Sequence, residues 1–192
     1  MDINKLIERI KNILTTPETE WPVIAAESTT VPDLYKNYIA IIAALPAIVV
    51  FIKGSLIGFS AFGLTARTPI GPGLAGMIVC YVLSLAMLYV ISLIIDALAP
   101  TFDGEKNQIQ ALKAATYAGT AGAIASIGLL VPWLGVLIAL AGGIYSIYLL
   151  YLGLPATMKC PPEKAGGYTA VSIICAAVLG GILALLVAGI TH

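Results

Sequence analysis

Long uncharged stretches, separated by short polar segments, set the hydrophobic pattern of this chain. Residues 114–158, between two lysines, carry no formal charge at all. As a helix, which rises about 1.5 Å per residue, this stretch would be roughly twice as long as the ~30 Å hydrocarbon core of a bilayer is thick. Pro132 and Trp133 lie near its middle, where a helix-breaking ring beside an interface-preferring indole favours a tight turn at the membrane surface. The pattern therefore predicts two membrane-spanning helices joined as a hairpin.

Similar uncharged windows predict five spans in all, and hence an all-α fold: a polytopic integral membrane bundle of five transmembrane helices. Each window is long enough to cross the hydrocarbon core as a helix. Lys53 interrupts the first window, where we expect its ammonium to reach the headgroups on an extended stem, and Pro46 could kink the same helix. The expected spans are residues 38–62, 74–98, 112–131, 133–153 and 169–190.

Composition supports a membrane location. Hydrophobic residues make up 59% of the chain and charged residues 10%, whereas an ordinary soluble domain is about a quarter charged. The net charge is +0, so the chain lacks the basic field that binding to nucleic acid requires. We therefore expect an integral membrane protein, of the inner cell membrane if the source is prokaryotic, whose partners include the lipid bilayer but not nucleic acid.

The basic residues predict how the chain is threaded through the membrane. All Lys and Arg residues except Lys53 and Arg67 fall on one side of the five expected spans, and such a bias marks the cytosolic side. The N-terminus is then cytosolic and the C-terminus lies outside, as an odd number of spans requires. The residues on the cytosolic side are Lys5, Arg9, Lys11, Lys36, Lys106, Lys113, Lys159 and Lys164.

Residues 1–37 are expected to form a cytosolic segment with an amphipathic helix, and residues 38–192 the five-helix transmembrane domain. Apolar side chains recur at helical spacing within residues 2–14, and Pro17 should end that helix. Such a helix could lie in the membrane interface, dock on the protein's own spans or recruit a partner. Trp21 is placed to anchor the following residues at headgroup level. The apolar positions are Ile3, Leu6, Ile7, Ile10, Ile13 and Leu14.

The sequence lacks the residue sets on which intramembrane enzymes depend. A serine protease needs a buried histidine, but the only histidine is His192, and an aspartyl protease needs two carboxylates, whereas the expected spans contain only Asp96. Neither clustered zinc ligands nor a phosphate-binding glycine motif is present, and Cys80, Cys160 and Cys175 are expected to be free thiols. We therefore predict a protein that is not an enzyme, with no catalytic residues, cofactor or metal.

Polar side chains gather toward the expected cytosolic ends of the second, third and fourth spans. A carboxylate within a span usually faces the protein interior or water, so Asp96 favours a cytosol-facing polar cavity or hydrogen-bonded cluster. In the alternative interpretation, Asp96 only reaches water or pairs with Lys113. The predicted cluster comprises Tyr89, Ser92, Asp96, Lys113, Thr116, Tyr117, Thr120, Tyr145 and Tyr148.

Small residues on the third and fifth spans predict close helix packing, because small side chains let backbones approach. The third span should therefore be central in the bundle. The fifth span offers a similar face, and one of these faces could form a homodimer instead of packing internally. These positions are Ala114, Ala118 and Gly122, then Ala115, Gly119 and Ala123, and in the fifth span Ala176, Gly180 and Ala184.

Short motifs spread over most of the chain carry a resemblance to a known family. Residues 17–22 read Pro-Glu-Thr-Glu-Trp-Pro, and Asp33, Leu34 and Tyr35 stand just before the first expected span. Together with five spans and a cytosolic N-terminus, these motifs resemble the Yip1 family. Further similarity lies in residues 110–113 leading to Tyr117, and in residues 151–155 and 158–159, while residues 36–38 and Thr116 depart from the eukaryotic signature and indicate a bacterial-type member.

The resemblance implies a five-span membrane protein whose eukaryotic relatives act in membrane trafficking, where they associate with prenylated Rab GTPases and with one another. Two function classes remain open. In the first, the chain organises membranes by binding a partner protein or lipid through its cytosolic face. In the alternative, it is a small ion or solute transporter or channel that uses the polar site around Asp96.

Overall fold

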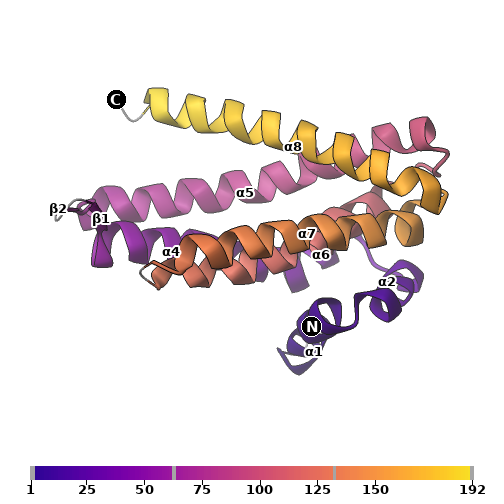
Figure 1. Cartoon of the computed structure of the whole chain (residues 1–192), viewed down its shortest axis with the longest axis horizontal. Helices are drawn as coiled ribbons and strands as arrows, with labels where there is room; N and C mark the ends of the chain where they lie inside the picture. Colours follow the sequence, from indigo (N-terminus) through magenta and orange to yellow (C-terminus); the bar gives the residue numbers. More distant parts are fainter. Residues whose placement is uncertain (1–2, 62–63, 132, 191–192) are drawn as a thin grey trace.

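The computed structural model describes residues 3–61, 64–131 and 133–190, and shows a bundle of long helices that lie side by side along one axis (Figure 1). The all-helical architecture predicted from the sequence is confirmed. In chain order the elements are α1 (Ile3–Thr15), α2 (Pro17–Ala26), α3 (Val31–Leu34), the π-helix η1 (Tyr35–Ile39), α4 (Ala40–Phe51), the π-helix η2 (Ile52–Ile57), β1 (Phe59–Ala61), β2 (Leu64–Ala66), α5 (Ile70–Leu98), the 3-10 helix η3 (Ala99–Phe102), α6 (Gln108–Ala125), the 3-10 helix η4 (Ser126–Leu130), α7 (Gly135–Met158) and α8 (Pro162–Ile190).

Four helical segments of the described chain are long and apolar enough to cross a membrane. They correspond to the first, second, fourth and fifth predicted spans. Each is at least as long as the hydrocarbon core requires, since about 20 helical residues suffice. The segments are Val31–Ile57, Ile70–Phe102, Gly135–Met158 and Pro162–Gly181.

The third predicted span forms α6 and η4 and is the most enclosed part of the bundle. Residues 111–118 are all buried, because α6 packs against α4, α5 and α7. The polar side chains within residues 111–118, which lower the hydropathy of this helix, therefore contact neighbouring helices and are not exposed on the outside of the bundle. On the α7 side, a Cβ atom at Gly142 would come within 2.1 Å of the Ala125 side chain, which is the close approach that small residues allow.

The first predicted span begins earlier and ends earlier than expected. Its helix runs over Val31–Ile57, with Pro46 inside α4, and Gly58 then adopts a φ of 91° that glycine accepts and other residues rarely do. The chain turns there into an antiparallel pair in which Phe59 lies opposite Ala66. An apolar hairpin therefore replaces the predicted last turn of the span, and Phe62, its predicted end, lies outside the described residues.

The N-terminal segment folds into two helices that pack on the flank of the bundle. Residues 3–15, where an amphipathic helix was predicted, form α1, and Pro17 occupies the first turn of α2. Leu6 and Ile13 of α1 are buried against the bundle, whereas Ile3 and Ile7 are 71% and 58% exposed. The helix therefore docks on the protein's own spans by one part of its apolar face and leaves the other part uncovered.

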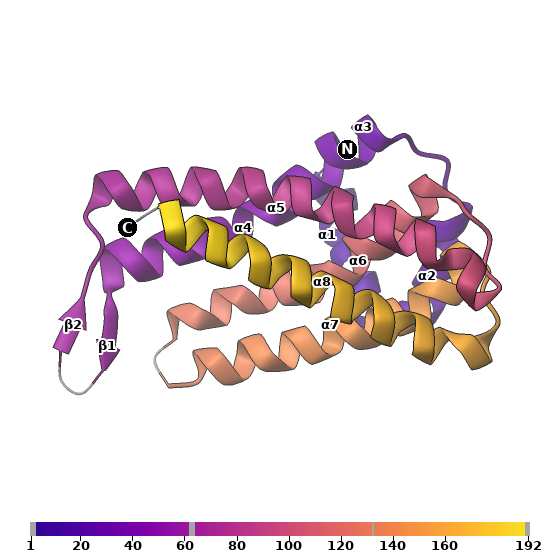
Figure 2. The ribbon, with the colours of Figure 1, turned by 90° about the horizontal axis from the view of Figure 1, so that it is seen from above.

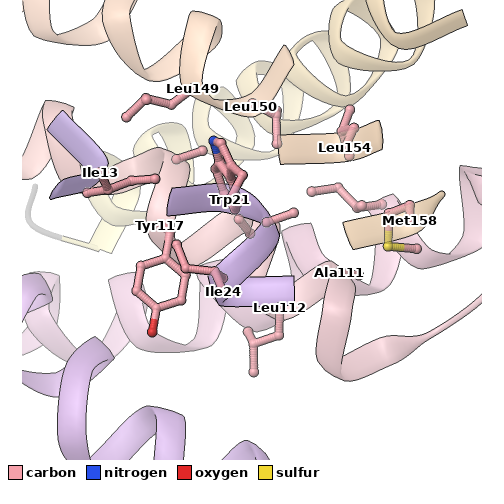
Figure 3. Close-up of a cluster of buried hydrophobic side chains, with 14 of the residues drawn as sticks. Ile13, Trp21, Ile24, Ala111, Leu112, Tyr117, Leu149, Leu150, Leu154 and Met158 are labelled. Carbon is pink, nitrogen blue, oxygen red and sulfur yellow. The ribbon is translucent and has the colours of Figure 1, made fainter. Parts of the chain in front are cut away.

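The predicted position of Trp21 at the membrane surface is wrong. The sequence placed it at headgroup level, but its side chain is only 1% exposed and lies in a core built from α1, α2, α6 and α7 (Figure 3). The reason is that α2 brings the indole against α7 and α6 before the first span begins. The core around it includes Ile13, Ile24, Ala111, Leu112, Tyr117, Leu149, Leu150, Leu154 and Met158.

The connections fall at two opposite ends of the bundle (Figure 2). One end carries the β1–β2 hairpin and the turn between η4 and α7, and the other carries α2 and the loops between α5 and α6 and between α7 and α8. Trp133, in the predicted turn, is 98% exposed, while Pro132 lies outside the described residues. The predicted polar cluster, which includes Asp96 and Lys113, belongs to the end that carries α2.

Candidate functional site

Lys113 of α6 joins the N-terminal helices to the bundle. Its side chain is buried, and its ammonium donates hydrogen bonds to the carbonyl oxygens of Ile24, Ala25 and Glu27 at 2.8, 3.4 and 2.6 Å. These carbonyls stand at the C-terminal end of α2, where helix carbonyls lack partners and a positive charge is favourable. The proposed pairing of Lys113 with Asp96 is therefore wrong, since the ion pairs of the described residues do not include it.

Tyr117, one turn further along α6, lies under an aromatic and charged layer. Its ring is 4.6 Å from that of Tyr38 and 6.4 Å from that of Trp21, measured between centroids. The guanidinium of Arg9 sits 6.0 Å from the Tyr117 centroid, close enough for a cation–π contact. Residues from α1, α2, η1 and α6 thus meet at one point.

Arg9 also links the two N-terminal helices through their acidic residues. It forms an ion pair with Glu20 and a second with Glu27, whose Oε1 lies 2.7 Å from its Nη2. Glu20 is buried, while Glu27 is exposed. Because one guanidinium pairs with both carboxylates, α1 and α2 are held together above α6.

Two hydroxyl contacts complete the docking. Tyr38 and Thr120 share a buried hydrogen bond of 2.9 Å between their hydroxyl oxygens, and the Tyr145 hydroxyl donates to the carbonyl oxygen of Leu14 at 2.8 Å. Thr120 also donates to its own helix, at the Thr116 carbonyl. The predicted residues Lys113, Tyr117 and Tyr145 therefore position the N-terminal segment, while Thr120 holds the start of the first membrane helix, and the sequence did not assign these roles to them.

Asp96 and Ser92 belong to a different group, between α5 and α8. Ser92 is fully buried, donates to the Tyr89 carbonyl at 2.7 Å and accepts from the Gln108 amide at 2.9 Å. One oxygen of Asp96 is buried and has no hydrogen-bond partner in the described structure. The predicted cluster is thus divided into two groups, one around Lys113 and Tyr117 and the other around Ser92 and Asp96.

Sequence reasoning missed the contribution of α8 to this second group. Tyr168, Thr169 and Ser172 are buried, and the Tyr168 hydroxyl donates to the Ile95 carbonyl beside Asp96. The Tyr168 ring also stacks on Phe102, with centroids 4.9 Å apart. Residues 168, 169 and 172 share a helical face, and this spacing is the signal that could have revealed them.

The side chains of three further predicted residues form no hydrogen bond with these groups in the described structure. Tyr89 and Tyr148 are 37% and 41% exposed, although the Tyr148 ring lies 5.7 Å from that of Tyr145. Thr116 is buried, and its hydroxyl has no hydrogen-bond partner among the described residues. Tyr89 therefore lies on the surface of the bundle, whereas Tyr148 lines an open pocket with Tyr145 and residues 15–19.

The motif Asp33, Leu34 and Tyr35 builds the start of the first membrane helix. Thr30 caps α3 by accepting a hydrogen bond from the Asp33 amide, and its hydroxyl donates to the Asp33 carboxylate at 2.6 Å. Leu34 is buried in the core, and the Tyr35 hydroxyl donates to the Leu85 carbonyl at 2.9 Å. The motif thus fixes where the helix begins and ties it to α5.

Neither group contains the parts of a catalytic site. Within the described ranges, no set of three or more His, Cys, Asp or Glu side chains could hold a metal ion. His192 lies outside those ranges. The arrangement offers instead a docked helical pair at one end and, beside it, the partly buried carboxylate of Asp96, one oxygen of which is buried.

Comparison with known proteins agrees with this architecture. The model of the Yip1 domain matches residues 11–186. The inner membrane protein YohC of Escherichia coli K12 is 26% identical over 161 residues, covering 82% of this chain and 83% of that protein, and YohC of a second E. coli strain matches to the same extent. No solved structure gives a significant match. Because the family model spans most of the sequence and the helices are those of a membrane bundle, the chain belongs to the Yip1 family and is an integral membrane protein.

Proposed function

We propose that this protein is a non-enzymatic, membrane-organising protein that binds a partner protein or lipid through its cytosolic face. The docking of α1 and α2 supports this proposal most directly, because it gives that end of the bundle a folded surface instead of a free tail. Ile3 and Ile7 remain exposed there, and Lys11 follows them on the same helical face. Apolar and basic residues on one face suit contact with anionic lipid or with an acidic partner.

We further propose that the chain crosses the membrane five times, with a cytosolic N-terminus and an outer C-terminus. The helix formed by α6 and η4 runs the length of the bundle beside α7 (Figure 2). Its modest hydropathy is compatible with a crossing, since its polar side chains are buried by neighbouring helices. The likeness to YohC, named as an inner membrane protein, supports the same membrane for this chain.

Photocrosslinking in living cells tests the proposed surface. A photoreactive amino acid at position 7 should form adducts with a defined protein or lipid, while the same group at Thr68, exposed just after the β1–β2 hairpin, should not form them. The double variant I3S/I7S should abolish any binding found in this way and leave the unfolding temperature unchanged. Equal adducts from both positions would contradict the proposal.

A second candidate function, transport of a small ion or solute, is favoured by the buried and unpartnered oxygen of Asp96. Carboxylates within membrane spans commonly mark ion or proton pathways. Solute or ion flux in proteoliposomes, compared between the wild type and the Asp96→Asn variant, tests this function. Flux that depends on Asp96 would favour transport over the membrane-organising role.

Self-association through α8 also remains a proposal. A Cβ atom at Gly180 would meet no neighbouring atom within 4 Å, so this part of the helix is open to a second copy. If α8 forms a dimer, Gly180→Leu should convert the protein to a monomer in detergent, as measured by light scattering. A wild type that is already monomeric would exclude this dimer.

A further inference from the structure

The contact between α5 and α8 brings a set of polar side chains together inside the bundle. The two helices run in opposite directions (Figure 1), and the Tyr168 hydroxyl donates to the Ile95 carbonyl. From that fixed point, Ser172 lies one turn along α8 and Ser92 about one turn back along α5. Because the helices are antiparallel, Thr169 then lies near the level of Asp96 along the bundle, and Ser172 near that of Ser92.

Four oxygen atoms in this region are buried and have no hydrogen-bond partner in the described structure. Thr169 and Ser172 are 4% and 2% exposed as whole residues, so water outside the bundle does not reach their hydroxyls. Leaving such groups unpaired costs free energy, most of all for a carboxylate. The four atoms are Asp96 Oδ1, Gln108 Oε1, Thr169 Oγ1 and Ser172 Oγ.

Four of the protein's cations at this end of the bundle are engaged elsewhere, and the exposed Lys106 forms no ion pair with Asp96 in the described structure. Lys113 donates to the carbonyls of α2, Lys159 pairs with Glu105 at 2.7 Å, and Lys164 pairs with Asp103. Arg9 pairs with the two glutamates of the N-terminal segment. The carboxylate of Asp96 therefore has no basic side chain as its counter-ion in the described structure.

We infer that Asp96, Thr169 and Ser172, with Gln108 at the margin, form a binding site for a monovalent metal cation such as Na⁺. Carboxylate, hydroxyl and amide oxygens are the ligands that hard cations prefer. One carboxylate neutralises one positive charge, whereas a divalent ion would keep an unbalanced charge in a medium of low dielectric constant. The inference uses the site of the second proposed function but does not depend on transport, because a bound ion can stabilise the bundle without moving.

Thermal unfolding of the full-length protein in detergent tests this inference, with NaCl replacing choline chloride at constant ionic strength. A ligand that binds only the folded state raises the unfolding temperature as its concentration rises. The wild type should gain roughly 2–4 °C in NaCl, and Asp96→Asn should lose that gain. Thr169→Val and Ser172→Ala should each need about tenfold more Na⁺ for half of the gain, which corresponds to the loss of one ligand.

Asp103→Asn is the matched control, because it removes an exposed carboxylate at the end of the same helix and should keep the whole gain. The inference is overturned if Na⁺, Li⁺ and K⁺ all leave the wild type unchanged, or if Asp96→Asn responds as the wild type does. If Asp96→Asn fails to fold, an unchanged Na⁺ dependence in Ser172→Ala overturns it. A Na⁺ response without flux would keep the site and remove the transport function, while flux without that response would do the reverse.

Discussion

The indole ring of Trp21 packs against Gly153 of α7 so closely that a Cβ atom at position 153 would lie 2.6 Å from it. Real Cβ atoms do not approach other atoms to that distance, so the ring and the glycine require each other. Trp21 belongs to α2 and Gly153 to a membrane helix far along the chain. This contact therefore joins the N-terminal segment to the membrane helices.

Replacement of Gly153 with Ala should destabilise the protein, because the indole would have to move within a packed core. Overpacking of this kind typically costs about 1–3 kcal/mol. Gly143→Ala on the same helix is the control, since a Cβ atom there meets nothing within 4 Å. Thermal unfolding of both variants in detergent measures the difference, and equal stability would show that α2 does not press on α7.

Lys113→Gln should loosen the N-terminal helices from the bundle. The variant removes a positive charge from the carbonyl end of α2, and hydrogen bonds to charged groups contribute about 1.5–3 kcal/mol. We expect faster hydrogen exchange across residues 17–27 and faster tryptic cleavage after Arg9 and Lys11. Lys106→Gln, at an exposed position in the preceding loop, should leave both rates unchanged. The docking account fails if the two variants behave alike.

Tyr38 and Thr120 should show a measurable coupling energy. Their hydroxyls share one buried hydrogen bond, so Tyr38→Phe or Thr120→Val alone leaves a buried group without its partner. The double variant should be less destabilised than the sum of the single ones, with a coupling of about 0.5–1.5 kcal/mol. Chemical or thermal unfolding of the four proteins gives this value, and a coupling of zero would mean that the bond does not stabilise the fold.

Cys160 should react slowly with thiol reagents even though it lies in a loop. Its side chain is 3% exposed, and burial raises the pKa of its thiol above the ordinary value. A raised pKa lowers the thiolate fraction at neutral pH, so the reaction should accelerate only as the pH rises toward that higher pKa. The rate of maleimide labelling against pH checks this in a variant with Cys80 and Cys175 replaced by Ala.

The control for Cys160 is Glu163→Cys in a variant without the three native cysteines, because position 163 is exposed in the same region. Its cysteine should react at the ordinary rate. Labelling of Cys160 as fast as position 163 at neutral pH would contradict its burial between α7 and α8.

The helices were predictable because their signal is strong and local. Uncharged windows of about 20 residues have few alternatives to a membrane helix, and α5, α7 and α8 follow them closely. The hairpin after Gly58 was not predictable in this way, because its apolar residues resemble a continuation of the span. Its cause is a backbone conformation at one glycine, which hydropathy does not report.

The candidate site was predictable only in part, because its geometry depends on which helices touch. Asp96 stood out as a carboxylate within a span, but helix order alone did not show that it and Tyr117 belong to different groups. Lys113 was expected at the end of a short connection, and its partners proved to be carbonyls of residues about 90 positions earlier in the chain. The hydroxyls of Thr169 and Ser172 were overlooked because small residues dominated the interpretation of that helix.

Labelling of introduced thiols from known sides of the membrane tests the central claim most directly. The five-crossing account predicts that a cysteine at position 67 is labelled by a membrane-impermeant maleimide in intact spheroplasts. A cysteine at position 106 should be labelled only after the membrane is permeabilised. Access to both positions from the same side would contradict the threading, and with it the cytosolic location of the docked N-terminal helices.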